Sequence, residues 1–450
     1  MKKYVDFTQG NIVRAIILFS IPLIMGELLQ NLYNSVDALV VGNLIDQHAL
    51  AAVTVCGTIA NMVINFFNGM SVGSNIVVAK ASGRGDTDRL CKAICAAFSC
   101  AVVLGLLLAL LSVIAAPRLL QLAGAQPNYF KDALTYLRVY LAGVMFTVIY
   151  NNAAGILRAI GRSDIPFRIL LIACCLNIVL DILLTGVMRL GILGVGIATV
   201  LSQGVSAMLV YHAINRAIRQ PCFNLRIMYE EGGSVISEML RVGTAAGIQS
   251  VLIGFSNIFV TRYMNSFSTE AVAGIGIAQR LDRFVILPAK SFGITMTTYV
   301  GQNLGAGQYQ RIRQGTKSCT AIALGITIGL STVIFAFTEQ CVSLFSSVSE
   351  VTDVGKNMLR VMAPLFWVMA LREILLGTLR GCGRNFFPTM LSLIGMVGIR
   401  QVFLAVTMHW KFTVENIYYC YPVAWIATLL LLVIYYLTVR KRLLPSKEKI

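Results

Sequence analysis

The chain has 450 residues and a formal net charge of +17, yet only 13% of its residues are charged and 57% are hydrophobic. Soluble domains have about 45–50% apolar and about 25% charged residues, so this composition excludes an ordinary soluble protein. A basic excess suits nucleic acid when it forms one face, but here Lys and Arg lie between apolar runs, as in the loops of a membrane protein. We therefore predict membrane lipids as the surroundings of the chain and no nucleic-acid partner.

Long apolar runs follow one another along the whole chain. A transmembrane helix needs about 20 mostly apolar residues. Twelve segments satisfy this requirement: 12–41, 51–79, 93–115, 132–155, 167–186, 193–213, 238–264, 272–302, 316–337, 355–379, 389–409 and 416–439. The first run has no small-residue cleavage pattern after a short apolar core, so we interpret it as a span and not as a signal peptide. The sequence thus predicts an all-α, polytopic membrane protein with twelve transmembrane helices.

Basic residues divide unequally between alternate loops. The loops on the same side as the N-terminus contain 24 Lys and Arg, and the loops on the other side contain six. Lys and Arg are enriched in cytoplasmic loops. This asymmetry predicts a multi-pass protein of the cell membrane (inner or plasma membrane) with both termini in the cytoplasm.

The two halves of the chain repeat one another. Residues 155–166 (GILRAIGRSDIP) and 377–388 (GTLRGCGRNFFP) share six identities at a shift of 222 residues, and the same shift aligns Gly83 with Gly305. Because six spans is an even number, both halves enter from the same side and form a parallel repeat. We predict an N-terminal lobe of helices 1–6 (1–214), a cytoplasmic linker (215–237) and a C-terminal lobe of helices 7–12 (238–450). Transporters with such repeats usually hold their site between the halves.

Two carboxylates lie inside predicted spans of the first half. Asp37 is in the first span, where it shares a helix face with Asn34, and Asp181 is in the fifth, one turn after Asn177. Thr199 in the sixth span adds a hydroxyl. Ionisable residues inside a membrane are costly and usually functional. Such oxygen ligands suit a hard cation such as Na⁺, but two nearby carboxylates also suit a proton, so both coupling ions stay open. We predict no other metal site.

The repeat provides an internal control for these residues. In the second half the equivalent positions hold Phe259 for Asp37, Phe403 for Asp181, Ile399 for Asn177 and Tyr421 for Thr199. A carboxylate that merely supported the fold would be expected to have a counterpart in at least one case. The asymmetry favours a specific cation site in the first half over a capping or hydrogen-bonding role.

Charged residues of the second half are open to two interpretations. Glu373 in the tenth span and Arg400 in the eleventh would form a charge pair across helices, or would contact substrate or carry a proton. Asn34 is a further candidate for substrate contact. Pro22 falls inside the first span, where a proline removes a backbone hydrogen bond and bends the helix.

Three pairs of glycines spaced four residues apart predict close helix packing: Gly69 with Gly73, Gly243 with Gly247, and Gly325 with Gly329. Arg158 and Arg162 end a predicted helix, where cations suit its dipole, and Gly161 permits the turn that follows.

Signals for an enzyme are missing from the sequence. No Gly-x-x-x-x-Gly-Lys-Ser/Thr loop exists to hold ATP phosphates. The three histidines, His48, His212 and His409, form no metal-binding or triad pattern. We therefore expect no catalytic residue and no cofactor, and transport driven by an ion gradient.

Several of these segments together resemble the multidrug and toxic compound extrusion (MATE) family over nearly the whole chain. The residues that carry the resemblance are Pro22, Gln30, Tyr33-Asn34-x-x-Asp37, Val41-Gly42, Leu50-Ala51-Ala52-Val53, Gly83, Leu157-Arg158-Ala159-x-Gly161, Asn177-x-x-x-Asp181 and the run from Gly301 to Gly307 (GQNLGAG).

The resemblance implies two six-helix lobes in a V shape and alternating access. It also implies export of drugs or other organic, often cationic, compounds or metabolites in antiport with Na⁺ or H⁺. By matching position, the cation site of the family is Asp37, Asn177, Asp181 and Thr199, and its bending proline is Pro22. A monomer is expected.

The competing class is a lipid-linked oligosaccharide flippase of the same superfamily, which would not need the two carboxylates. A channel or receptor is a third option, which the duplicated halves and the prolines inside spans disfavour.

Overall fold

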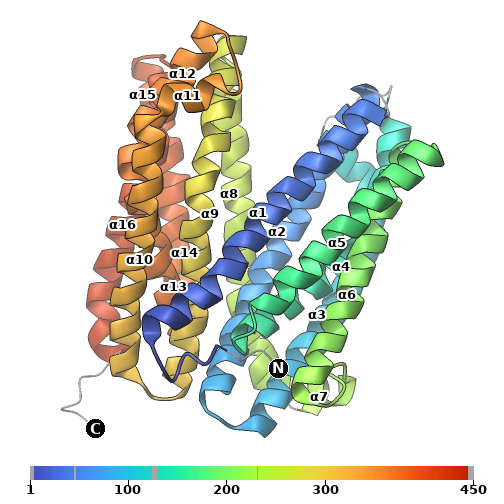
Figure 1. Ribbon diagram of the computed structural model, residues 1–450, viewed down its shortest axis with the longest axis vertical. Coiled ribbons are helices and arrows are strands. Elements are labelled where there is room, and N and C mark those ends of the chain that lie inside the picture. Colours follow the sequence, from blue (N-terminus) through green and yellow to red (C-terminus); the bar gives the residue numbers. More distant parts are fainter. Residues whose placement is uncertain (1–4, 45–46, 124–128, 231, 444–450) are drawn as a thin grey trace. The chain divides into compact units, whose positions relative to one another are not determined.

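The computed structural model describes residues 5–44, 47–123, 129–230 and 232–443, with side chains for all of these except 33–52, 54, 232 and 441–443. The described residues form helices joined by short turns, and contain no strand. The first half comprises α1 (Ile12–Leu44), α2 (Gln47–Gly83), α3 (Thr87–Leu122), α4 (Phe130–Ala159), α5 (Asp164–Asp181), the π-helical turn η1 (Ile182–Val187), α6 (Ile192–Ile218) and the short α7 (Leu225–Glu230) (Figure 1).

The second half repeats this order of long helices. It comprises α8 (Gly232–Met264), α9 (Thr269–Gly305), α10 (Tyr309–Ala336), the short α11 (Thr338–Ser343), α12 (Ser349–Met362), the 3-10 turn η2 (Ala363–Leu365), α13 (Phe366–Gly381), α14 (Phe386–Leu393), the π-helical turn η3 (Ile394–Ile399), α15 (Arg400–Trp410) and α16 (Glu415–Leu443). With the interrupted helices joined, each of the twelve predicted segments is helical. The all-α, polytopic fold is confirmed.

Ten of the described helical segments are long and apolar enough to cross a membrane. The two predicted spans outside this set are 272–302 and 355–379, which correspond to α9 and to α12 with α13. Both carry charged residues, and the second is interrupted at η2, which contains Pro364. Charged residues in such helices are tolerated where they face protein, and Asp282 of α9 and Arg372 of α13 are indeed buried.

The chain divides into two compact units, and each unit includes part of α1 and part of α8. Unit 1 comprises Met1–Asp6 and Ile21–Gly247, and unit 2 comprises Phe7–Ser20 and Ile248–Ile450. The division therefore falls inside α8 and α1, and not in the predicted linker 215–237. The lobe boundaries drawn from the repeat stay a prediction, because duplication and compactness divide a chain by different criteria.

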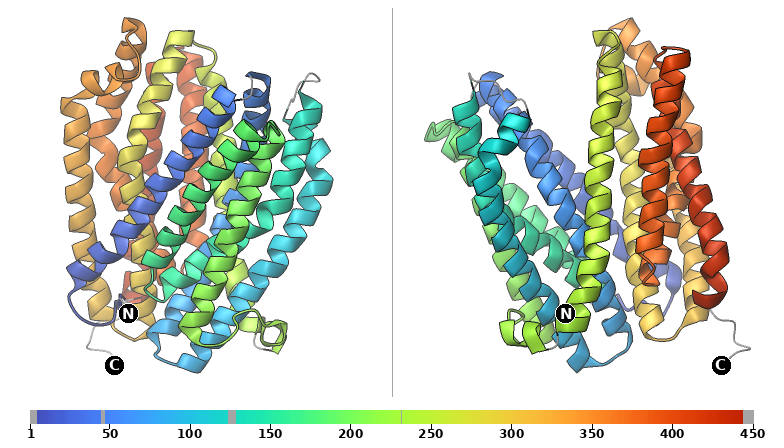
Figure 2. Two further views of the ribbon diagram at one scale, coloured as in Figure 1. Left: turned by 45° about the vertical axis from the view of Figure 1, so that its right-hand side comes forward. Right: turned by 180° about the vertical axis from the view of Figure 1, so that it is seen from behind.

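Helices within each unit pack lengthwise around apolar side chains. In unit 1, α4 contacts α2, α3 and α6, and α5 contacts α6 (Figure 1). One of its core clusters includes Phe98, Tyr150 and Ile156. In unit 2, whose helices from α9 onwards are coloured from yellow to red in Figure 2, α13 contacts α9, α10 and α16. Phe366 and Trp425 lie in the core of this unit.

The duplicated segment forms the same turn in both units. Gly161 and Gly383 have φ values of 85° and 79°, a left-handed conformation that glycine adopts without a steric penalty. The backbone N–H of Arg162 donates to the Leu157 carbonyl at 2.8 Å, and the equivalent bond of the second half is 3.0 Å. These bonds satisfy carbonyls at the end of a helix, so the predicted turn is confirmed.

Helix packing also follows the repeat. A Cβ atom on Gly155 of α4 would lie 2.8 Å from the Ser71 carbonyl oxygen of α2, and one on Gly377 of α13 would lie 3.0 Å from the Gly293 carbonyl carbon of α9. Ser71 and Gly293 are themselves 222 residues apart. The same close contact is therefore built twice.

Two of the three glycine pairs lie at a close contact between α2 and the first half of α8. Gly69 and Gly73 face Gly247 and Gly243, and a Cβ atom on Gly247 would lie 2.5 Å from the Phe66 carbonyl oxygen. The prediction for these two pairs is confirmed. The third pair was wrongly predicted to mark close packing, because a Cβ atom on Gly325 or Gly329 would meet no atom within 4 Å.

Candidate functional site

The polar residues of the candidate cation site lie in the interior of unit 1. Asn177 and Asp181 are 0% exposed and Thr199 is 6% exposed. Asn177 and Asp181 are one turn apart on α5, and Asp181 is its last residue, followed directly by the π-helical turn η1. Such π-turns often occur at functional sites.

The packing of α6 on η1 determines where Thr199 lies relative to Asp181 along the helix axes, a position called height below. A Cβ atom on Gly194 of α6 would lie 2.9 Å from the Thr185 hydroxyl of η1. Asp181 is four residues before Thr185, and Thr199 is five residues after Gly194. Because the two successive helices run in opposite directions and each residue advances about 1.5 Å, these positions lie at about the same height.

The hydroxyl of Thr199 retains an acceptor for a ligand. Its Oγ1 donates to the Val195 carbonyl oxygen at 3.0 Å, which uses the proton and leaves oxygen lone pairs. A hydroxyl oxygen, a carboxylate and an amide carbonyl are the ligand types that a hard cation prefers. Among the described residues, no three His, Cys, Asp or Glu side chains lie together as a metal-binding group.

Two predicted site residues lie outside the described side chains. Asp37 and Asn34 are on α1, whose backbone is helical through Leu44, but nothing further is described at these positions. The structure thus brings Asn177, Asp181 and Thr199 into one region of unit 1. The contribution of Asp37 stays a prediction.

The equivalent region of unit 2 has different chemistry. Phe403 and Tyr421 pack against the apolar core, and the Tyr421 hydroxyl accepts a hydrogen bond from Gln279 Nε2 at 2.8 Å. An arginine, Arg400, lies 5.9 Å from the centre of the Tyr421 ring. Unit 2 therefore carries a buried cation near the positions where unit 1 carries a carboxylate.

The predicted charge pair between Glu373 and Arg400 is wrong. Glu373 pairs instead with its neighbour Arg372. Arg400 is 1% exposed, and its Nη2 donates to Ser256 Oγ at 2.7 Å and to Asn257 Oδ1 at 2.9 Å. Because α8 supplies these oxygens, Arg400 is neutralised in part by dipoles and not by a carboxylate from α13.

Pro22 lies beside the point where α1 passes from one unit to the other. Ser20 belongs to unit 2, where its hydroxyl bonds to the Thr295 hydroxyl of α9 at 2.8 Å. Four residues after Pro22, Gly26 faces α5 of unit 1, with its Cβ position 4.0 Å from Leu170 and Phe167. The proline therefore weakens the backbone of α1 between two attachments.

The arginine of the duplicated segment interacts with a polar side chain of another helix in each unit. Glu27 of α1 and Tyr150 interact electrostatically with Arg158 of α4. In unit 2, Arg380 Nη2 donates to Gln249 Oε1 at 2.8 Å. Gln249 is the repeat equivalent of Glu27, so the arginine of the duplicated segment interacts with the same position in both units, through charge in unit 1 and through a hydrogen bond in unit 2. Comparing the halves at Glu27 would have revealed this.

The run after Gly301 holds the segment before α1, a role that the sequence did not indicate. Phe7 is 0% exposed and its backbone N–H donates to Gln302 Oε1 at 3.2 Å. Asn303 Nδ2 and Arg311 Nε donate to the Phe7 carbonyl at 3.1 and 2.8 Å. The Phe7 ring packs edge-on against Tyr299. These contacts fix the start of α1 to unit 2.

The fold and the buried polar residues together define a polytopic α-helical membrane protein with an internal repeat. The MatE family model matches residues 22–183 and 245–406, an offset of 223 residues at both ends. The chain belongs to the MatE family, whose members are transporters and not enzymes.

Similar proteins cover most of the chain. The chain is 28% identical to the probable multidrug resistance protein YpnP of Bacillus subtilis over 91% of both chains. It is 27% identical to the probable multidrug resistance protein YoeA of the same organism, over 97% of this chain and 96% of the relative. The multidrug export protein MepA of Staphylococcus aureus is 22% identical over 88% of both.

Solved structures share the fold. An outward-facing multidrug resistance MATE family transporter of the MOP superfamily matches with a TM-score of 0.88 at 21% identity, over 98% of both chains. A MOP superfamily transporter from Pyrococcus furiosus, described as having a binding pocket of reverse polarity, matches equally well. This likeness confirms the expected fold.

Proposed function

We propose that the chain is a secondary active transporter that exports drugs or other organic, often cationic, compounds in antiport with Na⁺ or H⁺. The observation that carries the proposal is the buried group of Asn177, Asp181 and Thr199, whose counterparts in unit 2 are Ile399, Phe403 and Tyr421 and include no carboxylate or amide. An ionisable side chain buried inside a transmembrane segment has a high free-energy cost and is usually functional. The names of the relatives, which include multidrug export, support the cargo.

Helix register supports a role for Asp37 in the same site. Within unit 1, the part of α1 from Ile21 onwards runs in the same direction as α5 (Figure 1). Gly26 of α1 faces Leu170 of α5. Asp37 and Asp181 each lie eleven residues further on, about 16 Å along both helices. A cation at this height would bridge the two helices.

The mechanism follows from charge. Two carboxylates at one height repel each other unless one takes a proton or a cation. A cationic drug is favoured while the site is negative and disfavoured once a cation neutralises it. Cation binding also draws α1 towards α5, and the missing backbone bond at Pro22 permits the helix to bend. By linkage, drug and cation lower the affinity of each other by the same factor, typically about 5–150.

The distribution of Lys and Arg supports an orientation with both termini in the cytoplasm of the cell, and we propose that the transporter works as a monomer. Export then moves cargo out of the cytoplasm, and the coupling ion enters down its own gradient. This orientation can be measured by labelling single cysteines placed in alternate loops.

A binding titration tests the competition. A fluorescent cationic drug is titrated against the purified protein at several pH values and Na⁺ concentrations. The variant is Asp181→Asn, and the matched control is Glu339→Gln, which removes one exposed carboxylate of α11 that pairs with Lys356. The drug affinity of the wild type and of Glu339→Gln should fall as one of the two cations rises, and that of Asp181→Asn should not. If the drug affinity of the wild type is independent of both pH and Na⁺ concentration, the mechanism is ruled out.

The cargo class is tested in cells. Deletion should raise susceptibility to a panel of cationic drugs, and expression of the wild-type chain should restore resistance. A defect of the cell envelope without any change in drug susceptibility would indicate the flippase alternative instead.

A further inference from the structure

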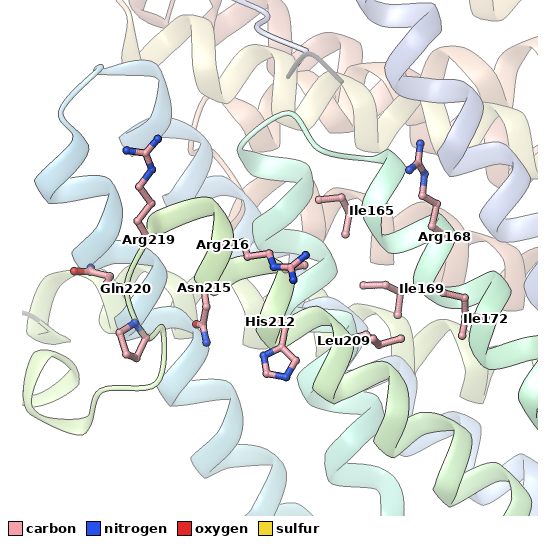
Figure 3. Close-up of a pocket in the computed structure, with 12 residues that line it drawn as sticks. Ile165, Arg168, Ile169, Ile172, Leu209, His212, Asn215, Arg216, Arg219 and Gln220 are labelled. Carbon is pink, nitrogen blue, oxygen red and sulfur yellow. The ribbon is translucent and has the colours of Figure 1, made fainter. Parts of the chain in front are cut away.

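A cavity of about 730 Å³ lies between the start of α5 and the end of α6 (Figure 3). It is far along α5 from Asp181, which ends that helix. Its twelve lining residues come from α5, from α6 and from the turn that follows α6, and none of them is acidic.

Basic side chains form one side of this cavity. Arg168 comes from α5, Arg216 from the end of α6 and Arg219 from the turn directly after it, with Arg216 between the other two in Figure 3. Arg168 lies 3.9 Å from Asp164, a carboxylate that also binds Arg162 at 3.0 Å. Among the described side chains, Arg216 and Arg219 have no acidic partner. The cavity is therefore strongly positive.

Aliphatic side chains form the other side. Ile165, Ile169 and Ile172 follow one face of α5 at helical spacing, and Leu209 of α6 adjoins them. Ile172 is 51% exposed. Because α5 with η1 and α6 are both candidate membrane spans, this wall continues into the region where lipid chains lie, and the arginines mark the level of the headgroups.

The turn that closes the cavity is held in place. Asn215 Oδ1 accepts a hydrogen bond from Cys222 N at 2.8 Å, and the Cys95 thiol of α3 donates to the Pro221 carbonyl at 3.6 Å. Arg219 has a φ of 59°, a left-handed conformation that is costly for a residue with a side chain. Glycine would relieve this cost, so substitution by glycine removes the charge without straining the turn.

We propose that this cavity binds an anionic phospholipid, with its phosphate on Arg168, Arg216 and Arg219 and an acyl chain against the wall of Ile169 and Ile172. Guanidinium groups match phosphate oxygens in a two-point geometry, and basic pockets between transmembrane helices suit anionic headgroups. The continuous aliphatic wall selects a lipid over a soluble phosphate. The inference requires that the chain spans a membrane, and it is independent of the proposed transport cycle.

Native mass spectrometry of the full-length protein provides the test. The protein is titrated with phosphatidylglycerol, with phosphatidylcholine of the same acyl chains, and with glycerol 3-phosphate, which has the headgroup phosphate but no chain. Phosphatidylglycerol should bind most tightly. Arg216→Gln should weaken it about fivefold, and the double variant Arg216→Gln/Arg219→Gly about 25-fold.

Two further variants separate charge from the wall. Arg226→Gln removes one positive charge from α7, where Arg226 pairs with Glu230 outside the cavity, and should leave lipid binding unchanged. Ile172→Asn should weaken phosphatidylglycerol and leave glycerol 3-phosphate as it was. Melting temperatures show that each variant is folded. Three results would each overturn the proposal. The protein could bind phosphatidylglycerol no more tightly than phosphatidylcholine, or no more tightly than glycerol 3-phosphate. Alternatively, Arg226→Gln could weaken phosphatidylglycerol binding as much as Arg216→Gln does.

Discussion

The contact between α2 and α8 allows a prediction that compares two glycines on one helix. A Cβ atom added at Gly247 would lie 2.5 Å from the Phe66 carbonyl oxygen and 2.9 Å from Phe66 Cδ2, whereas one added at Gly254 would meet no atom within 4 Å. Carbon–oxygen contacts are ordinarily no closer than about 3.3 Å. In Gly247→Ala the two helices must therefore separate by about 0.8 Å.

The magnitude follows from packing and helix propensity. Overpacking costs about 1–3 kcal/mol, and alanine returns up to about 1 kcal/mol of helix propensity relative to glycine. Because both variants gain the same helix propensity, Gly247→Ala should be less stable than Gly254→Ala by about 1–3 kcal/mol, and Gly254→Ala should itself be neutral or slightly stabilising. Both variants replace a glycine of α8, so a difference between them reports the contact alone.

The assay is thermal unfolding of both purified variants in the same detergent. At about 2–4 °C per kcal/mol for a unit of this size, Gly247→Ala should melt several degrees below Gly254→Ala. Equal melting temperatures would show that the backbones of α2 and α8 do not approach as described.

Three other changes have distinct readouts. Pro22→Ala restores a backbone donor in α1 and should slow drug efflux from proteoliposomes without lowering the melting temperature; normal efflux would remove Pro22 from the cycle. Phe7→Ala empties a fully buried site and should cost about 3–5 kcal/mol on unfolding, so a loss below about 1 kcal/mol contradicts its burial. Burial raises the pKa of the Cys222 thiol to about 12, so at pH 8 maleimide should label it more slowly than the partly exposed Cys382. Asn215→Ala removes the hydrogen bond that holds the turn and should speed labelling of Cys222. Labelling of Cys222 in the wild type as fast as that of Cys382 would contradict its burial.

The parts of the structure that the sequence could predict are those set by local composition. Apolar runs predict helices because a membrane leaves no other partner for the backbone. Gly161 and Gly383 predict turns because only glycine adopts a positive φ freely. The burial of Asn177 and Asp181 also follows from their place in an apolar run, one turn apart on a single face.

The remaining features depend on which helix faces which. Gly325 and Gly329 have the same spacing as Gly243 and Gly247 but face open space, and spacing alone cannot distinguish these cases. The sequence predicts the Glu373 carboxylate as a partner of Arg400, but Arg400 donates its hydrogen bonds to Ser256 and Asn257. Such pairings are decided by tertiary packing.

The segment before α1 and the π-turns gave even weaker signals. Phe7 is one aromatic residue in a short polar stretch, and its binding site is formed by residues almost 300 positions away. The π-turns η1 and η3 adjoin the buried residues Asp181 and Arg400, but the apolar residues within them are compatible with an ordinary α-helix. Only the internal repeat carries information beyond local structure, because equivalent positions of the two halves occupy equivalent places in the fold.

The central claim is that a carboxylate site in the first half couples a cation gradient to export. The direct measurement is efflux of a fluorescent cationic dye from proteoliposomes under separately imposed Na⁺ and pH gradients, with the wild type, Asp181→Asn and the matched variant Glu339→Gln. The account predicts that one of the two gradients drives efflux by the wild type and by Glu339→Gln, and that neither drives efflux by Asp181→Asn at equal reconstitution. Gradient-driven efflux by Asp181→Asn at the wild-type rate would contradict the claim.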